Sequence, residues 1–300
     1  MTNRCSRLKL VLLAVALAGS APAAAADLVL RAASGPYVEA VIGGTRLRLR
    51  VELDHAPAVT LNPDAAARAG LQGDGKWLEQ IGPVKLRGRK QDLRLLIEGT
   101  PAEAEVRWHD RKVAADADGQ VSIHALPFDS VTIERREAGP GEREVALQTK
   151  VHDNHGVYVP VLAGRRKIAV RLSFSRPRTS APAAAGAALA QVHGGMLEPR
   201  KSYEEISLGV MRPVWPMQLA TPLRFGGLAV PLLMVRASDF RGKHRLQRRQ
   251  EEGMEGIVVT GERRSQDALY RITVGTDVLG RCSAATYSRA SGVLRLRCAP

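Results

Sequence analysis

Apolar and polar residues alternate in two stretches of the chain that lie far apart in the sequence. In both stretches the apolar side chains occupy every second position: Leu47, Leu49, Val51 and Leu53 in the first, and Ile168, Val170, Leu172 and Phe174 in the second. A period of two places all of these side chains on one face of an extended segment. Each stretch therefore predicts a half-buried β-strand, and a glycine turn precedes it, at Gly43-Gly44 and at Gly164.

The two strands belong to a longer internal repeat. Residues 35–56 (GPYVEAVIGGTRLRLRVELDHA) and 156–177 (GVYVPVLAGRRKIAVRLSFSRP) align without a gap, each position in the second copy lying 121 residues after its counterpart. Both copies begin with glycine, carry tyrosine two residues later and continue into the alternating stretch. A duplicated strand pair predicts two related lobes.

Each copy is followed by further elements in the same order. Alanine-rich segments predict helices, the first with Asn62 as its N-cap and Pro63 as its first residue, the second ending at Gly194. A second hairpin follows each helix, turning near Gly88 in the first copy and at Gly226-Gly227 in the second. In chain order, the expected segments are 65–71, 84–97, 121–126 and 131–133, and then 183–189, 223–235 and 274–279.

A glycine- and proline-containing linker at residues 138–141 separates the copies. We therefore divide the chain into an N-terminal lobe, residues 27–137, and a C-terminal lobe, residues 143–300. Residues 241–267 begin with a basic stretch without apolar periodicity, which predicts a mobile surface insertion.

The C-terminal segment predicts a hairpin closed by a disulfide. A tight turn sets positions whose numbers sum to 580 opposite each other, including Thr286 against Leu294 and Cys282 against Cys298. Gly292 supplies the positive φ that such a short loop needs. Opposed Cβ atoms lie close enough for a disulfide, and an exported protein retains one. We therefore predict a Cys282–Cys298 disulfide, with two buried free thiols as the alternative.

The first 26 residues have the features of a signal peptide. A basic start precedes an apolar run at residues 10–18 that is too short to span a bilayer, and Ala24-Ala25-Ala26 favours cleavage before Asp27. No later apolar run is long enough to cross a membrane. We therefore expect a periplasmic or secreted chain that does not span the membrane.

The chain is strongly basic. Its 44 Lys and Arg against 30 Asp and Glu give a net charge of +14, and cleavage after Ala26 would remove three basic residues and leave +11. Such a charge favours anionic partners, such as an envelope polymer or an acidic peptide. The alternative is an arginine-rich surface that is only solvated. Export, and the scarcity of aromatic residues among the basic ones, argue against nucleic acid.

The order of elements resembles that of the retropepsin-like and pepsin-like aspartic peptidases. In that family a glycine-turn hairpin delivers Asp-Thr/Ser-Gly, a small-residue helix and a flap hairpin follow, and an apolar-apolar-Gly-x-Asp/Asn-x-Leu segment closes the lobe. Residues 51–56 and 65–71 fit this order, and Val274-Gly275-Thr276-Asp277-Val278-Leu279 is the closest single match. The resemblance covers most of the exported chain. It implies a mainly β fold of two retropepsin-like β-barrel lobes related by a pseudo-twofold axis.

Both catalytic motifs depart from the family pattern. Asp54 stands where the family has its first Asp, but His55-Ala56 replaces Thr/Ser-Gly, and Ser175-Arg176-Pro177 offers no carboxylate. Aspartic proteolysis needs two carboxylates that share one proton. We therefore expect this chemistry to be lost. Asp54 is then either a relic carboxylate that binds a ligand or cation, or an Asp that caps its own turn.

Other candidate sites carry weaker signals. His152 and His155 are three residues apart beside an Asp, which is at most half a zinc site, and ordinary turn chemistry explains the same residues. Under the resemblance, Asp277 N-caps the turn that Val278 begins, and His124, at the equivalent position of the first lobe, is structural. We expect no metal and no cofactor.

These observations favour an exported, non-catalytic protein that binds an extended peptide or another envelope ligand in the cleft between the lobes. The first alternative is an active aspartic endopeptidase that uses Asp54. The second is a structural envelope protein that binds anionic polymers.

Overall fold

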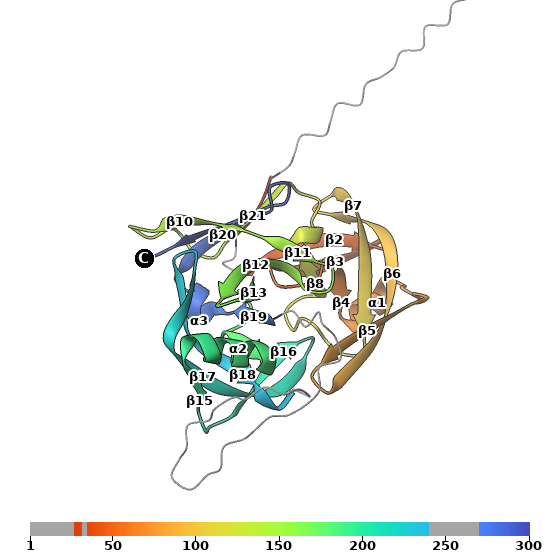
Figure 1. Ribbon diagram of the computed structural model, residues 1–300. Helices are drawn as coiled ribbons and strands as arrows, with labels where there is room; N and C mark the ends of the chain where they lie inside the picture. Colours follow the sequence, from red (N-terminus) through yellow and green to blue (C-terminus); the bar gives the residue numbers. More distant parts are fainter. Residues whose placement is uncertain (1–26, 32–34, 240–269) are drawn as a thin grey trace, which may run out of the picture.

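The computed structural model describes residues 27–31, 35–239 and 270–300. The predicted signal peptide, residues 1–26, and the predicted insertion, residues 241–267, lie outside the described residues. The described chain is mainly β, as predicted, and its strands form three sheets (Figure 1). None of its helices has the length and apolar character needed to cross a membrane.

The first sheet contains a closed six-stranded barrel. Its strands are hydrogen-bonded in the order β2 (Tyr37–Ile42), β3 (Thr45–Glu52), β8 (Gly119–Ser122), β4 (Val59–Leu61), β7 (Thr100–His109) and β6 (Val84–Ile97), and β6 pairs back with β2. A further strand, β5 (Gly75–Ile81), pairs with the far end of β6. The alternation in β3 has its expected effect, because Leu47, Leu49 and Val51 are buried while Arg46 and Arg48 are exposed.

The second sheet has nine strands. Its main path runs β11 (Lys150–His152), β12 (Gly156–Ala163), β13 (Arg166–Leu172), β19 (Tyr270–Val274), β14 (Ser180–Pro182), β18 (Leu228–Arg236), β17 (Val210–Phe225) and β15 (Gly195–Leu197), and β16 (Ser202–Ser207) also pairs with β17. The predicted turn at Gly226-Gly227 joins β17 to β18, where Phe225 pairs with Leu228.

The two copies of the repeat form equivalent hairpins, β2–β3 and β12–β13. In the first copy β3 pairs in parallel with β8, β8 antiparallel with β4, and β4 in parallel with β7. In the second copy β13, β19, β14 and β18 repeat this sequence of directions. The strand order is therefore duplicated along with the sequence, while the pseudo-twofold axis stays a prediction.

A third, five-stranded sheet combines strands from both sides of the predicted linker. Its order is β1 (Asp27–Arg31), β9 (Ser130–Glu134), β20 (Cys282–Ser288), β21 (Val293–Cys298) and β10 (Arg143–Gln148). One apolar core includes side chains of all three sheets, such as Ile42, Ile168 and Leu296. The strands on either side of residues 138–141, β9 and β10, thus belong to the same sheet. The division into two lobes stays a prediction.

All of the short helices except η3 lie close to positions expected from the sequence. They are α1 (Pro63–Arg68), α2 (Ala183–His193), α3 (Thr276–Leu279) and two 3₁₀ turns, η2 (Ile123–Ala125) and η3 (Ala237–Asp239). Gly194 ends α2 in the left-handed conformation, as predicted. Asn62 lies at the N-cap of α1, but its side chain makes no capping bond. It instead donates to the carbonyl oxygens of Ala114 and Ala117 and accepts from the Val113 N–H, so it fixes a neighbouring loop.

The predicted hairpin at residues 84–97 is wrong. These residues form the single long strand β6, and the turns lie at its two ends, at Gly82 and Gly99, both with positive φ. Gly88 serves a different purpose in mid-strand, because a Cβ there would lie 2.4 Å from the carbonyl oxygen of Trp108. The glycine permits close approach of β7 rather than a turn.

The C-terminal hairpin carries the predicted Cys282–Cys298 disulfide. Its register, however, is shifted by one residue beyond the cysteines, because a β-bulge lies between Cys282 and Ala284. Leu294 consequently pairs with Tyr287 and not with Thr286. The Tyr287 ring is fully buried, and its hydroxyl lies 2.8 Å from Nδ1 of His124, which gives that histidine a structural contact.

Candidate functional site

The loops that follow the two repeated hairpins meet between the first and second sheets. Gly156, at the start of β12, packs on the backbone of His55, and a Cβ at this glycine would lie 1.9 Å from the His55 carbonyl oxygen. The φ of Gly156 is +72°, so glycine is required on both counts. This contact brings the Asp54 loop of one copy against the second copy.

Asp54 is buried and forms an ion pair. Its Oδ2 lies 3.2 Å from Nε of Arg176, the residue after Ser175. Burial alone would raise the pKa of Asp54, but the guanidinium groups of Arg176 and Arg171 outweigh it and lower the pKa. Asp54 is therefore held as a carboxylate, and its hydrogen-bond partner in the second copy is a cation rather than a second carboxyl group.

Ser175 donates a hydrogen bond to a carboxylate that the sequence analysis missed. Its Oγ lies 2.9 Å from Oε2 of Glu52, and the other Glu52 oxygen accepts from Nε of Arg50 at 2.7 Å. Burial, and next the charge of Asp54, raise the pKa of Glu52 to about 7. The sequence did contain a signal that Glu52 and Asp54 lie close together, because side chains two residues apart on extended backbone point to the same side.

His55 and His155 are both neutral at physiological pH. Nε2 of His55 lies 2.8 Å from Oγ1 of Thr60, and burial lowers the pKa of His55 to about 4. The His155 ring lies against the guanidinium of Arg271, with both ring nitrogens within 2.7 Å of one Arg271 nitrogen. Burial, followed by the charge of Arg271, lowers the pKa of His155 to about 3.

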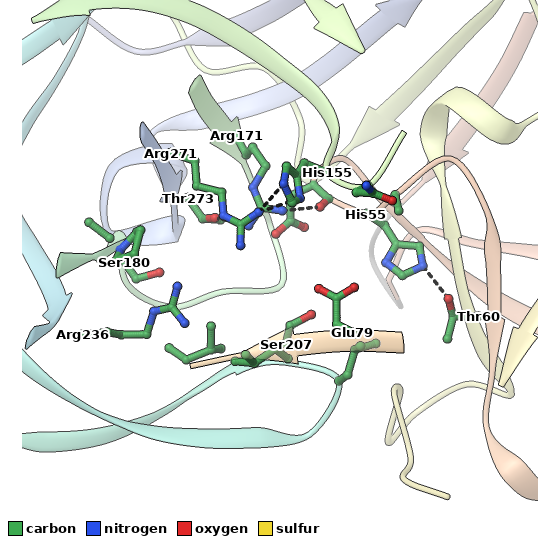
Figure 2. A pocket seen from close by; sticks show the side chains of 18 of the residues that line it. His55, Thr60, Glu79, His155, Arg171, Ser180, Ser207, Arg236, Arg271 and Thr273 are labelled. Atoms are coloured by element: carbon green, nitrogen blue, oxygen red, sulfur yellow. Dashed lines mark hydrogen bonds between the residues drawn. The ribbon is translucent and has the colours of Figure 1, made fainter. Parts of the chain in front are cut away.

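A small cavity of about 60 Å³ opens beside these residues. Figure 2 shows Arg171 and Arg271 above this space, with Arg236, Ser207 and Glu79 below it. The lining residues come from β4, β5 and β7 of the first sheet, from β13, β14, β16, β18 and β19 of the second, and from loops between strands. A larger cavity of about 500 Å³ adjoins it and shares six lining residues: Asp54, His55, Arg171, Ser180, Ser207 and Leu208.

Two of these arginines carry charge that the site does not neutralise by contact. Arg171 donates to the Asp54 carbonyl oxygen at 3.1 Å and to Oγ1 of Thr273 at 2.8 Å, and its buried Nε has no partner. Burial lowers the pKa of Arg171 and of Arg271 to about 10 each. Both nevertheless remain cations at neutral pH. Together they make this end of the cleft positively charged.

The remaining candidates have structural contacts. His152 and His155 bracket a turn, closed by the His155 N–H on the His152 carbonyl oxygen at 3.0 Å, as the turn interpretation predicted. Within the described chain, no group of three His, Cys, Asp or Glu side chains is placed to hold a metal ion. Asp277 is not the N-cap of α3, a position that Gly275 takes. Its carboxylate accepts from the Thr179 N–H and hydroxyl, both at 2.8 Å, and from the Val278 N–H at 3.0 Å.

Comparison with known proteins gives no assignment: no family model and no curated protein matches the chain.

Proposed function

We propose that this protein is an exported, non-catalytic relative of the two-lobed aspartic peptidases, and that it binds an extended peptide in the cleft between its lobes. The observation that carries the proposal is the state of Asp54. Its carboxylate is paired with Arg176 at 3.2 Å, and Ser175 occupies the position 121 residues later. An aspartic peptidase would need a second carboxyl group there to share a proton with the first.

Two hairpins that meet over the cleft support binding of an extended ligand. The β5–β6 hairpin and the β16–β17 hairpin contribute Ile81, Leu86, Leu208 and Val210 to a small apolar cluster that is separate from the main core. Ile81 and Leu208 also line the small cavity. Because so few apolar side chains join the hairpins, they can separate at low cost and admit a chain between them. Extended peptides pair readily with strands in such a position.

A cleft-filling substitution tests this function. Ser207 lines both cavities, so Ser207→Trp should displace a bound peptide. Ser291 lies exposed in the turn of the C-terminal hairpin, so Ser291→Trp is the matched control. We expect wild type and Ser291→Trp to retain peptides from a random decapeptide library on a column, and Ser207→Trp to retain at least tenfold less. Equal retention by all three proteins would contradict cleft binding.

Hydrolysis is the second candidate function, and Glu52 is the observation that favours it. Glu52, with its pKa raised to about 7, lies close enough to the ionised Asp54 for the two charges to interact. Two carboxyl groups whose pKa values are driven apart are the usual basis of acid–base catalysis. Cleavage of a peptide library by wild type, abolished in both Glu52→Gln and Asp54→Asn, would establish this function in place of the first.

A further inference from the structure

The small cavity is lined by more positive than negative side chains. Its lining includes four arginines, Arg107, Arg171, Arg236 and Arg271, against two acidic residues, Asp54 and Glu79. Two of these charges are already paired with residues outside the cavity, because Asp54 binds Arg176 and Arg107 binds Glu105. Among the remaining charges, Arg171, Arg271 and Glu79 set the balance beside the proposed site.

Glu79 does not neutralise the cluster. It forms no ion pair with Arg171 or Arg271 among the described residues, and burial raises its pKa in spite of the surrounding guanidinium groups. Arg171 donates to two neutral oxygens, the Asp54 backbone carbonyl and Oγ1 of Thr273. Among the residues that the structure describes, the Arg271 guanidinium has only the neutral ring of His155 as a hydrogen-bond partner. Burying cations without a carboxylate partner is costly, so an anion in the cavity would stabilise this arrangement.

The shape and position of the cavity define the anion. The small cavity shares six lining residues with the adjoining cleft of about 500 Å³, so a carboxylate can enter it from a chain that lies in that cleft. Guanidinium groups present paired donors that match the two oxygens of a carboxylate. Figure 2 shows Arg236 and Arg271 directed toward the same open space.

We propose that the cavity beside Arg171 and Arg271 binds a carboxylate of a peptide that lies in the adjoining cleft, either its C-terminal carboxylate or an acidic side chain. This inference rests on the proposed function, and it adds that the peptides bound are acidic at one defined position. It also assigns Arg271 a role in ligand recognition in addition to its contact with His155.

Four fluorescein-labelled octapeptides of Ala, Ser and Val test the inference by fluorescence anisotropy. The first has a free C-terminal carboxylate and the second is amidated and neutral. The third is amidated with a central Glu, and the fourth is amidated with a central phosphoserine. A charge-assisted contact predicts that the first or the third binds about 10- to 100-fold more tightly than the second. Which of these two binds more tightly identifies the source of the carboxylate.

Arg271→Met removes the proposed contact, and Arg46→Met is the control, because Arg46 is an exposed arginine that lines neither cavity. We expect Arg271→Met to abolish the preference for acidic peptides while leaving affinity for the neutral peptide unchanged. It should also unfold at the same or a higher urea concentration, because it removes a desolvated charge. Arg46→Met should bind like wild type. If Arg271→Met fails to fold, Arg271→Lys takes its place in the experiment. Arg271→Lys should lose most of the preference for acidic peptides, because lysine lacks the paired donors of a guanidinium.

The outcomes separate the two proposals. Binding of all four peptides with equal affinity, or a preference that survives in Arg271→Met or Arg271→Lys, would overturn the carboxylate site and leave the proposed function standing. Tightest binding of the phosphoserine peptide would overturn the choice of carboxylate. If none of the four peptides binds, the proposed function itself is overturned, and the carboxylate site with it.

Discussion

Replacing Glu52 by Gln should change how the stability of the protein depends on pH. Glu52 is only 5% exposed, and it accepts hydrogen bonds from Ser175 and Arg50. Burial and the neighbouring charge of Asp54 raise its pKa from 4.5 to about 7. Gln preserves the shape and a hydrogen-bond acceptor but cannot ionise, so Glu52→Gln isolates the free energy associated with this one proton.

The direction of this pH dependence follows from the protons that Glu52 binds in the folded and the unfolded chain. Below pH 4.5 both the folded and the unfolded chain hold the proton on Glu52. Between pH 4.5 and pH 7 only the folded chain holds it, so the free energy of unfolding of wild type falls as pH rises through this range. Above about pH 7 the loss is complete. A change in pKa from 4.5 to about 7 corresponds to about 3 kcal/mol.

Urea unfolding of wild type and Glu52→Gln from pH 4 to pH 8 provides the assay. His55 and His155 change the free energy of unfolding over the same pH range in the opposite direction. The quantity to follow is therefore the difference in free energy of unfolding between wild type and Glu52→Gln. We expect Glu52→Gln to gain about 3 kcal/mol relative to wild type between pH 4 and pH 8. Any contribution that is independent of pH cancels in this comparison. A difference that stays constant over the range would refute the account of Glu52.

Three further predictions concern stability. Gly156→Ala should lower the free energy of unfolding by at least about 3 kcal/mol in urea unfolding, because its Cβ would meet the His55 carbonyl oxygen at 1.9 Å on backbone with φ of +72°; an unchanged midpoint would contradict the close contact. Replacing both Cys282 and Cys298 by Ser should cost about 3 kcal/mol in the same assay, as expected for a loop of this length in the chain-entropy model, and this double variant should then be as stable as reduced wild type. His155→Asn should lessen the loss of stability as pH falls below 6.5, because the unfolded histidine binds a proton there and the folded one does not until about pH 3; identical acid unfolding curves would argue against a buried neutral ring.

The sequence predicted the strands and their duplication because those features are local or periodic. Alternation along β3 and β13 sets their buried faces, and the constant spacing of 121 anticipates the shared strand order of the two sheets. The errors came from glycine and from a bulge. Gly88 permits close packing on β7 rather than a turn, and the bulge after Cys282 shifts a register that a symmetric count of residues cannot detect.

The site was less accessible to sequence reasoning. Asp54 was found through the repeat, and the loss of a carboxylate at Ser175 follows from the same alignment. The small cavity was missed because its arginines, Arg171, Arg236 and Arg271, come from three different strands that only the sheet order brings together. Each one, taken alone in the sequence, is indistinguishable from the many arginines of a basic chain.

The central claim, that the cleft binds peptides without cleaving them, is tested most directly by mass spectrometry of a peptide library incubated with an equal amount of protein at pH 4 and at pH 7. The bound and free fractions are separated before analysis, and Asp54→Asn is treated in parallel. Our account predicts a bound fraction of intact peptides and no new peptide ends in either fraction. New ends produced by wild type, inhibited by pepstatin and absent with Asp54→Asn, would contradict it.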